Sequence, residues 1–176
     1  MQKILIISGI VISVIIIVIF GLRIYTKSFS PEDQALYKDG DRVIEVNYCR
    51  PSKNEREIFG ELIPYGKIWR TGANEATTIS FNDDYLVSGK PINAGKYSLF
   101  SIPGKDEWTV IFNEQTGQWG TIYNEGRDVL RVKVKTETTD IPVQKFTVEY
   151  EKKNDTVFVV LMWDDVRVKV PMVEMD

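Results

Sequence analysis

Hydrophobic residues follow two different patterns along the chain, one in the first 22 residues and another beyond residue 42. Residues 4–22 contain no charged side chain, and isoleucine and valine dominate the stretch. At about 1.5 Å rise per residue, a helix of this stretch is roughly 30 Å long, which matches the hydrocarbon core of a bilayer. The pattern therefore predicts one N-terminal transmembrane helix whose partner is the lipid bilayer, contacted through residues 4–22.

Beyond residue 42, most hydrophobic residues alternate with polar ones or form short apolar runs. A period of two residues is typical of strands that bury one face, and a short continuous apolar run is typical of a central strand. At least eight segments have one of these patterns: 44–48, 77–81, 97–102, 108–112, 130–135, 145–151, 157–163 and 166–170. We therefore expect this part of the chain to be all-β.

Turn-forming residues separate these segments, among them Asn-Asp-Asp at 82–84, Lys-Asn-Asp at 153–155 and Asp-Asp at 164–165. Short connections predict that consecutive strands pair as antiparallel hairpins. Because no long amphipathic helix is available to cover a sheet, the apolar face must pack against another sheet. We predict an antiparallel two-sheet sandwich, jelly-roll-like, with a partly closed barrel as the alternative.

The predicted organisation has three parts. Residues 1–27 form a signal anchor or transmembrane helix, and residues 42–176 form the β-sandwich domain. Residues 28–41 form a linker, in which Ser30-Pro31 has the character of a helix start, so a short helix is expected through residues 35–37.

The alternative for the N-terminal part is a cleaved secretory signal. Such a signal usually has an apolar region of about 7 to 15 residues followed by small residues. Here the apolar run is longer and the first alanine is Ala35, which favours an uncleaved anchor.

Charges on the two sides of the apolar stretch are nearly balanced, with Lys3 and the α-amino group before it and Arg23 and Lys27 after it. The signal-like layout nevertheless favours export of the residues on the C-terminal side of the stretch. The sequence therefore predicts a single-pass membrane protein whose C-terminal β domain lies outside the cytoplasm.

Composition excludes several kinds of chemistry. The 176-residue chain has no histidine, which removes the commonest general base, the commonest metal ligand and every histidine-containing triad. Cys49 is the only cysteine, and we expect a small sheet residue there, because a catalytic thiolate would need a basic partner. The formal net charge is −3 with both signs interleaved, which argues against nucleic acid. No catalytic residue, metal site or cofactor is predicted.

One long segment, residues 50–76, breaks the alternating pattern. Long ordered connections in compact domains are usually functional or cover another part of the fold. This segment combines aromatic, cationic, amide and carboxylate side chains, a mixture that can build a concave binding site for a sugar or a peptide end. With two aromatic walls from elsewhere, the predicted ligand-binding residues are Trp69, Arg70, Thr71, Asn74, Glu75, Tyr97 and Trp119.

A purely structural role for the same residues is the alternative. Arg70 and Glu75 would then form a partly buried ion pair that braces the segment, while Asn74 would cap a turn. If the whole stretch is buried, it is a folding element rather than a site.

Several motifs are similar to those of a bacterial family. They are Tyr-Cys-Arg-Pro at 48–51, Ile-Phe-Gly at 58–60, Pro-Tyr-Gly-Lys-Ile-Trp-Arg-Thr-Gly-Ala-Asn-Glu-Ala-Thr at 64–77, Ala-Gly-Lys-Tyr-Ser-Leu-Phe at 94–100 and Trp-Thr-Val-Ile-Phe-Asn at 108–113. Over about residues 43–176, the chain resembles the family catalogued as domain of unknown function 2911 (DUF2911). The resemblance implies an exported, β-rich bacterial domain without an established activity. The family often has serine where this chain has Cys49, so no serine nucleophile is available there.

Two functional hypotheses are compatible with these observations. The first is a membrane-anchored extracytoplasmic β-domain that acts as a ligand-binding or interaction module at the bacterial cell envelope, with a carbohydrate or peptide ligand. The alternative is a carboxylate-dependent hydrolase that acts on envelope polysaccharide, because two carboxylates suffice for glycoside hydrolysis. Glu75 with Asp83, Glu125 or Asp128 would supply such a pair.

Overall fold

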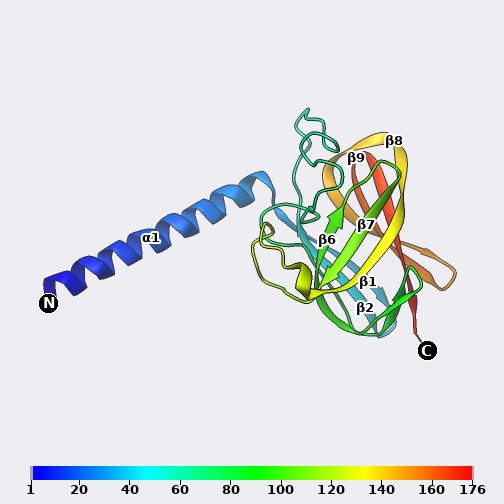
Figure 1. The fold of residues 1–176 in the computed structure, drawn as a ribbon, viewed down its shortest axis with the longest axis horizontal. Coiled ribbons are helices and arrows are strands. Elements are labelled where there is room, and N and C mark those ends of the chain that lie inside the picture. The colour runs from blue at the N-terminus through cyan, green and yellow to red at the C-terminus, as the bar shows by residue number, and fades with distance from the viewer. Residues whose placement is uncertain (1, 176) are drawn as a thin grey trace.

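The computed structural model describes residues 2–175, which form one α-helix, one short 3-10 helix and nine β-strands. Helix α1 (Gln2–Phe29) extends away from the rest of the chain (Figure 1). The short helix η1 spans Glu125–Arg127. The strands are β1 (Glu32–Asp39), β2 (Arg42–Cys49), β3 (Thr78–Phe81), β4 (Tyr85–Val87), β5 (Lys90–Ile92), β6 (Gly95–Ile102), β7 (Glu107–Asn113), β8 (Asp128–Lys153) and β9 (Thr156–Glu174).

Helix α1 is long and apolar enough to cross a membrane over Ile6–Phe29, with a mean hydropathy of 2.7 and none of that stretch buried against the domain. Exposure of apolar side chains such as Ile17, which is 69% exposed, to water is energetically unfavourable. The helix therefore has the properties of a membrane span or of a signal sequence, as its uncharged sequence predicted.

The strands of residues 2–175 form one antiparallel sheet in the order β1-β2-β3-β6-β7-β8-β9-β4-β5. The sheet is open at β1 and β5 and is not a barrel. The prediction of an antiparallel all-β fold preceded by one apolar helix is confirmed. The predicted hairpins are present where β6, β7, β8 and β9 follow one another and each pairs with the next.

The two layers of the fold are continuous through β8 and β9, which are long enough to belong to both. The first part of β8 pairs with β7, and the later part pairs with β9. The β8–β9 register shifts on both sides of Val143, next to Pro142, and such irregularities bend a strand. The bend lets the sheet fold over itself, and Tyr150 Oη of β8 donates to Ile44 O of β2 at 3.0 Å. The two layers of the predicted sandwich are thus two parts of one folded sheet.

Two local predictions are wrong. Residues 35–37 lie in strand β1 and not in a short helix: Ala35 is buried between exposed neighbours, and β1 pairs with β2 along its whole length. The unpaired edge of β2 offers backbone partners to these residues, which a short isolated helix would lack. Asp164 and Asp165 lie inside β9, where Asp164 (φ 56°) opposes Val143 in the irregular stretch, so they form a bulge instead of a turn.

Aromatic side chains dominate the core between the two layers. Trp69 and Trp163 stack with their ring centroids 6.1 Å apart, and Phe59, Trp108 and Phe146 pack around them in edge-to-face contacts. All five side chains are buried. Because Phe59 and Trp69 come from residues 50–76, the long segment contributes directly to the core.

Candidate functional site

The stretch from Trp69 to Thr77 is a tight, buried turn. Thr71 and Asn74 have left-handed backbone conformations (φ 50° and 57°), and Gly72 has φ 150°. Hydrogen bonds hold the turn closed: Thr77 Oγ1 donates to Thr71 O at 2.6 Å, and Thr71 Oγ1 donates to Ser101 Oγ at 2.9 Å. The turn therefore projects residues 74 and 75 in a fixed direction away from the core.

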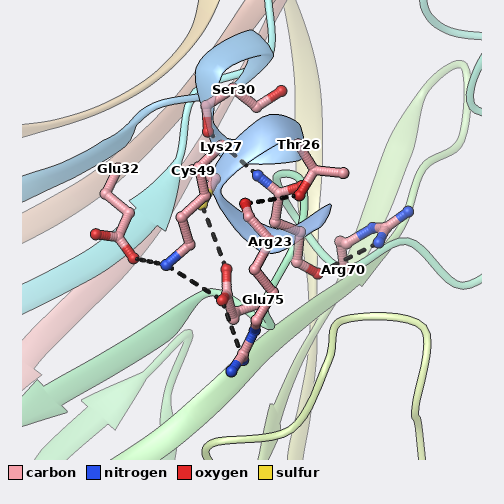
Figure 2. A network of polar contacts seen from close by, with 9 residues as sticks. Arg23, Thr26, Lys27, Ser30, Glu32, Cys49, Arg70 and Glu75 are labelled. Atoms are coloured by element: carbon pink, nitrogen blue, oxygen red, sulfur yellow. Dashed lines mark hydrogen bonds and ion pairs between the residues drawn. The ribbon is translucent and has the colours of Figure 1, made fainter. Parts of the chain in front are cut away.

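That direction leads to the end of helix α1. Glu75 Oε1 lies 3.3 Å from Arg23 Nη2 and 3.2 Å from Lys27 Nζ, and Lys27 Nζ also lies 2.5 Å from Glu32 Oε1 (Figure 2). Asn74 Nδ2 donates to Ser30 O at 3.2 Å. We call this contact the anchor joint (Arg23, Lys27, Glu32, Asn74, Glu75). It connects the last turns of α1 to the buried turn of the domain.

Beside the anchor joint lies a hollow of 620 Å³ on the outer face of the sheet. Its lining includes the acids Glu32, Asp33 and Glu75 and residues 116–118. The floor is polar and comes from four neighbouring strands: Gln34, Asn47, Thr78 and Lys96. Three acids and one lysine line this hollow, which we call the acidic groove.

Cys49 lies at the back of the acidic groove, where its Sγ is 3.9 Å from Glu75 Oε2 (Figure 2). The residue is only 3% exposed, and burial raises the pKa of its thiol, with the nearby Glu75 carboxylate acting in the same direction. A thiol with a raised pKa is a poor nucleophile. This environment agrees with a small sheet residue.

The structure brings only some residues of the predicted binding site together: Trp69 and Arg70 line a common hollow of 450 Å³, whereas Glu75 lines the acidic groove. Trp69 and Thr71 are interior, and Asn74 is buried with its side chain at the anchor joint. Tyr97 stacks on Phe81, with centroids 5.6 Å apart, and packs against the core. Of the predicted residues, only Glu75 lines the acidic groove.

Arg70 and Trp119 lie near the joint. Arg70 is half-buried, its Nη1 donates to Asn74 O at 3.3 Å, and burial lowers the pKa of its guanidinium group. Trp119 pairs with Glu75 through a backbone bridge, and the Arg23 guanidinium lies 5.8 Å from the centroid of its ring. Among the described residues, the acid Glu75 pairs with Arg23 and Lys27, so the expected Arg70–Glu75 ion pair is not formed.

Sequence reasoning missed the contributions of Lys27, Glu32 and Asp33. Residues 32 and 33 lie in the segment interpreted as a linker, so their carboxylates were not connected with a site. No periodic signal was available, because Glu-Asp-Gln-Ala-Leu-Tyr has three polar residues followed by three apolar ones and lacks the alternation of a strand.

A second polar cluster, at η1 and the start of β8, has a structural character. Asp128 Oδ2 accepts hydrogen bonds from Tyr123 Oη at 2.6 Å and from Arg131 Nε at 2.8 Å. Burial and the hydrogen bond to Asp128 raise the pKa of Tyr123 to about 12. Asp128 and Glu125 both bind Arg131 and do not line the acidic groove. Within the described part of the chain, no three residues drawn from the acids and Cys49 lie close enough together to bind one metal ion.

Comparison with known proteins identifies a family. The family model described as "Protein of unknown function (DUF2911)" matches residues 30–172, which extends from the residue after α1 to the last part of β9. Neither a curated protein nor a solved structure matches the chain.

Proposed function

The chain belongs to the DUF2911 family, and we propose that it is a single-pass binding module of the bacterial cell envelope. In this proposal α1 spans the membrane, the β domain lies outside the cytoplasm, and the acidic groove holds a peptide segment that carries a basic side chain. The observation that carries the proposal is the anchor joint, where carboxylates beside the groove already bind one ammonium and one guanidinium group.

The position of the groove supports a role close to the membrane. Only Ser30 and Pro31 separate α1 from β1, and Arg50 N donates to Pro31 O at 2.8 Å. Glu75 contacts Arg23, the first charged residue after the apolar stretch. The groove would therefore open at the level of the lipid headgroups, within reach of segments that leave the same membrane.

The chemistry of the groove supports a peptide with a basic side chain. Cationic groups gain from charge-assisted hydrogen bonds to carboxylates, and the carboxylates that line the groove already bind such groups: Asp33 pairs with Arg50, and Glu75 pairs with Arg23 and Lys27. The side-chain amides of Gln34 and Asn47 can donate to and accept from a peptide backbone. An edge strand, β1, also lies along the groove and suits an extended ligand.

A sugar ligand has less support, because sugar faces usually pack on an exposed aromatic ring. Trp69 is buried in the core, Tyr97 stacks on Phe81, and Trp119 is covered on one side by Arg23. The hydrolase alternative has less support too. None of the acids expected to pair with Glu75, namely Asp83, Glu125 and Asp128, lines the acidic groove, and Lys27 Nζ binds both Glu32 and Glu75 there.

A direct test is the binding of fluorescent peptides to the full chain in detergent micelles. Two peptides of equal length are compared, one alternating lysine with threonine and the other alternating glutamate with threonine. We expect saturable binding of the lysine peptide at low salt, weaker binding at high salt and no binding of the glutamate peptide.

The variant Thr78→Trp fills the floor of the groove, and Glu149→Trp places the same side chain on an exposed position of β8 outside the groove. Binding of the lysine peptide should be lost in Thr78→Trp and kept in Glu149→Trp. Equal binding by both variants, or no saturable binding by the unmodified chain, would contradict the proposal. A chitin oligosaccharide that binds in place of the peptide would instead support the sugar ligand.

A further inference from the structure

A second hollow lies against the end of α1 and has the opposite charge. Its volume is 450 Å³, and it is lined by residues of the helix end, of the long segment and of β9, among them Phe29, Ser30, Arg56, Leu62, Arg70 and Trp163. None of the described residues that line it is acidic. We call it the arginine pocket.

The two arginines of this pocket lack carboxylate partners among the described residues. Arg56 donates only to backbone oxygens, those of Ser52 at 2.6 Å and Lys53 at 3.0 Å. Arg70 donates from Nη1 to Asn74 O at 3.3 Å, also a backbone oxygen. Arg70 is half-buried, so its guanidinium group is less hydrated than in water, and no carboxylate compensates. Burial of a charged group costs free energy unless the charge is paired. Both guanidinium groups keep donors for an anionic ligand.

Trp163 provides a third donor. Its side chain is 2% exposed and lines the pocket, and its indole Nε1 is buried without a hydrogen-bond partner among the described residues. Buried N–H groups are nearly always paired, so this donor, on a side chain that lines the pocket, leaves one hydrogen bond to be made, and an acceptor in the pocket would reach it after a small shift of the ring. Two unpaired guanidinium groups and one indole N–H are a suitable set of donors for a phosphate group.

The surroundings of the pocket favour a lipid as the source of that phosphate. Phe29 is the last residue of α1 and is 61% exposed, and Leu62 at the other side is 43% exposed. The pocket thus combines two exposed apolar side chains with two arginines, at the end of the helix that would emerge from the bilayer. An anionic phospholipid matches both features, because its headgroup can contact Arg56 and Arg70 while its acyl chains contact Phe29 and Leu62.

We propose that the arginine pocket binds the phosphate of an anionic phospholipid headgroup, with Arg56, Arg70 and Trp163 as donors. The phosphate site itself does not depend on the acidic groove; only the lipid source rests on the proposed membrane position of α1. Binding would add a second contact between the end of α1, the domain and the membrane surface.

The test uses the purified full chain in a neutral detergent, with intrinsic tryptophan fluorescence as the readout. The probes are dihexanoylphosphatidylglycerol, dihexanoylphosphatidylcholine and inorganic phosphate. We expect a saturable change with the phosphatidylglycerol, a weaker one with the phosphatidylcholine and the weakest with inorganic phosphate, which lacks acyl chains. Phosphate that binds as tightly as the lipid would support the anionic pocket and identify a free anion as its ligand.

Arg70→Gln is the obvious variant, but its half-buried stem makes it sensitive to misfolding, so exposed Arg56 provides a second variant. Arg56→Gln removes one charge-assisted contact, and the phosphatidylglycerol should bind roughly tenfold more weakly. Trp163→Phe keeps a ring but removes the N–H, and binding should weaken a few-fold. The matched controls are Arg127→Gln, an exposed arginine outside the pocket, and Trp108→Phe, a core tryptophan that does not line it.

Unchanged lipid affinity in both Arg56→Gln and Trp163→Phe would overturn the proposal, as would the absence of any saturable response in the unmodified chain. Equal loss of affinity in the control variants would also overturn it, because the effect would then be a general consequence of altered charge or packing. If the lipid binds but the lysine peptide does not, the result would support the arginine pocket and contradict the function proposed for the acidic groove.

Discussion

Arg23 and Glu75 are 52 residues apart in the chain, yet Arg23 Nη2 lies 3.3 Å from Glu75 Oε1. The pair joins the N-terminal helix to the motif at residues 64–77, which lies within the part of the chain that the DUF2911 family model matches. Because Arg23 is half exposed, the ion pair contributes little to stability, on the order of 0–1 kcal/mol. Its consequence is geometric: Trp69 of the motif is fixed in the aromatic core, and Glu75 of the same motif contacts helix α1.

Replacement of Trp69 by alanine should destabilise the domain strongly. The indole is 8% exposed and contacts four other aromatic rings, so its removal leaves a cavity that the folded sheet cannot close easily. We expect a loss of about 3–5 kcal/mol in the free energy of unfolding. Urea unfolding of the full chain in detergent, followed by circular dichroism, measures it. Trp119→Ala, at a partly exposed position, should cost clearly less; equal losses would contradict the core role of Trp69.

The turn at Gly72 should tolerate no side chain. Its φ is 150°, and an added Cβ would lie 2.9 Å from Thr77 Oγ1 and 3.1 Å from Cys49 O. Gly66 is a matched control, because it also has a positive φ (71°) but open space around the added atom. Gly72→Ala should therefore lower the unfolding free energy by more than Gly66→Ala, which loses only about 1 kcal/mol from backbone strain. A smaller loss at Gly72 than at Gly66 would show that the turn is loosely packed.

Alkaline pH should lower the free energy of unfolding of the domain because Tyr123 ionises. Its pKa is near 10 in an unfolded chain but is raised to about 12 in the fold by burial and by the hydrogen bond to Asp128. The folded state therefore favours the neutral phenol, so the contribution to stability is complete below about pH 10 and is lost as the pH rises through about 12. Unfolding free energies measured across this range should fall more steeply for the unmodified chain than for Tyr123→Phe. Parallel profiles would contradict the raised pKa.

Cys49 should react slowly with thiol reagents while the protein is folded. The side chain is buried and burial raises the pKa of the thiol, so little thiolate is present or accessible at neutral pH. Ellman's reagent should label it slowly in native protein and fully in urea. Asp155→Cys, which adds a thiol at an exposed hairpin position, should react at once at the added site. Rapid labelling of the unmodified chain would indicate an accessible, activated cysteine.

The sequence predicted those features that depend on local pattern. Alternation at residues 130–135 placed strand β8, and the absence of charge at residues 4–22 placed α1, because each pattern reports directly on the surface that a residue must bury. It did not predict that β8 and β9 continue past Pro142 and Asp165, since a bulge and a turn use the same residue types. The strand at residues 32–39 depends on the free edge of β2, which is a tertiary feature.

For the candidate site, the sequence singled out Glu75 but not its partners. Arg23 and Lys27 belong to the helix that was interpreted only as a membrane span, and no periodic pattern links them to residue 75. Trp69 and Tyr97 were expected to wall a pocket, yet both pack with other aromatic rings. Burial of an individual aromatic side chain depends on which neighbours the fold supplies, and the sequence does not specify them.

The envelope location of the proposed binding module and the lipid source for the arginine pocket both rest on a domain held at a bilayer by α1. The most direct measurement is the distribution of the full chain, expressed in a bacterial host, between membrane and soluble fractions after a wash in alkaline carbonate, with the mass of the protein determined in each fraction. We predict that the protein stays in the membrane fraction with residues 1–27 still attached. A protein released into the soluble fraction, or one shortened at its N-terminus by the apolar segment, would contradict the account.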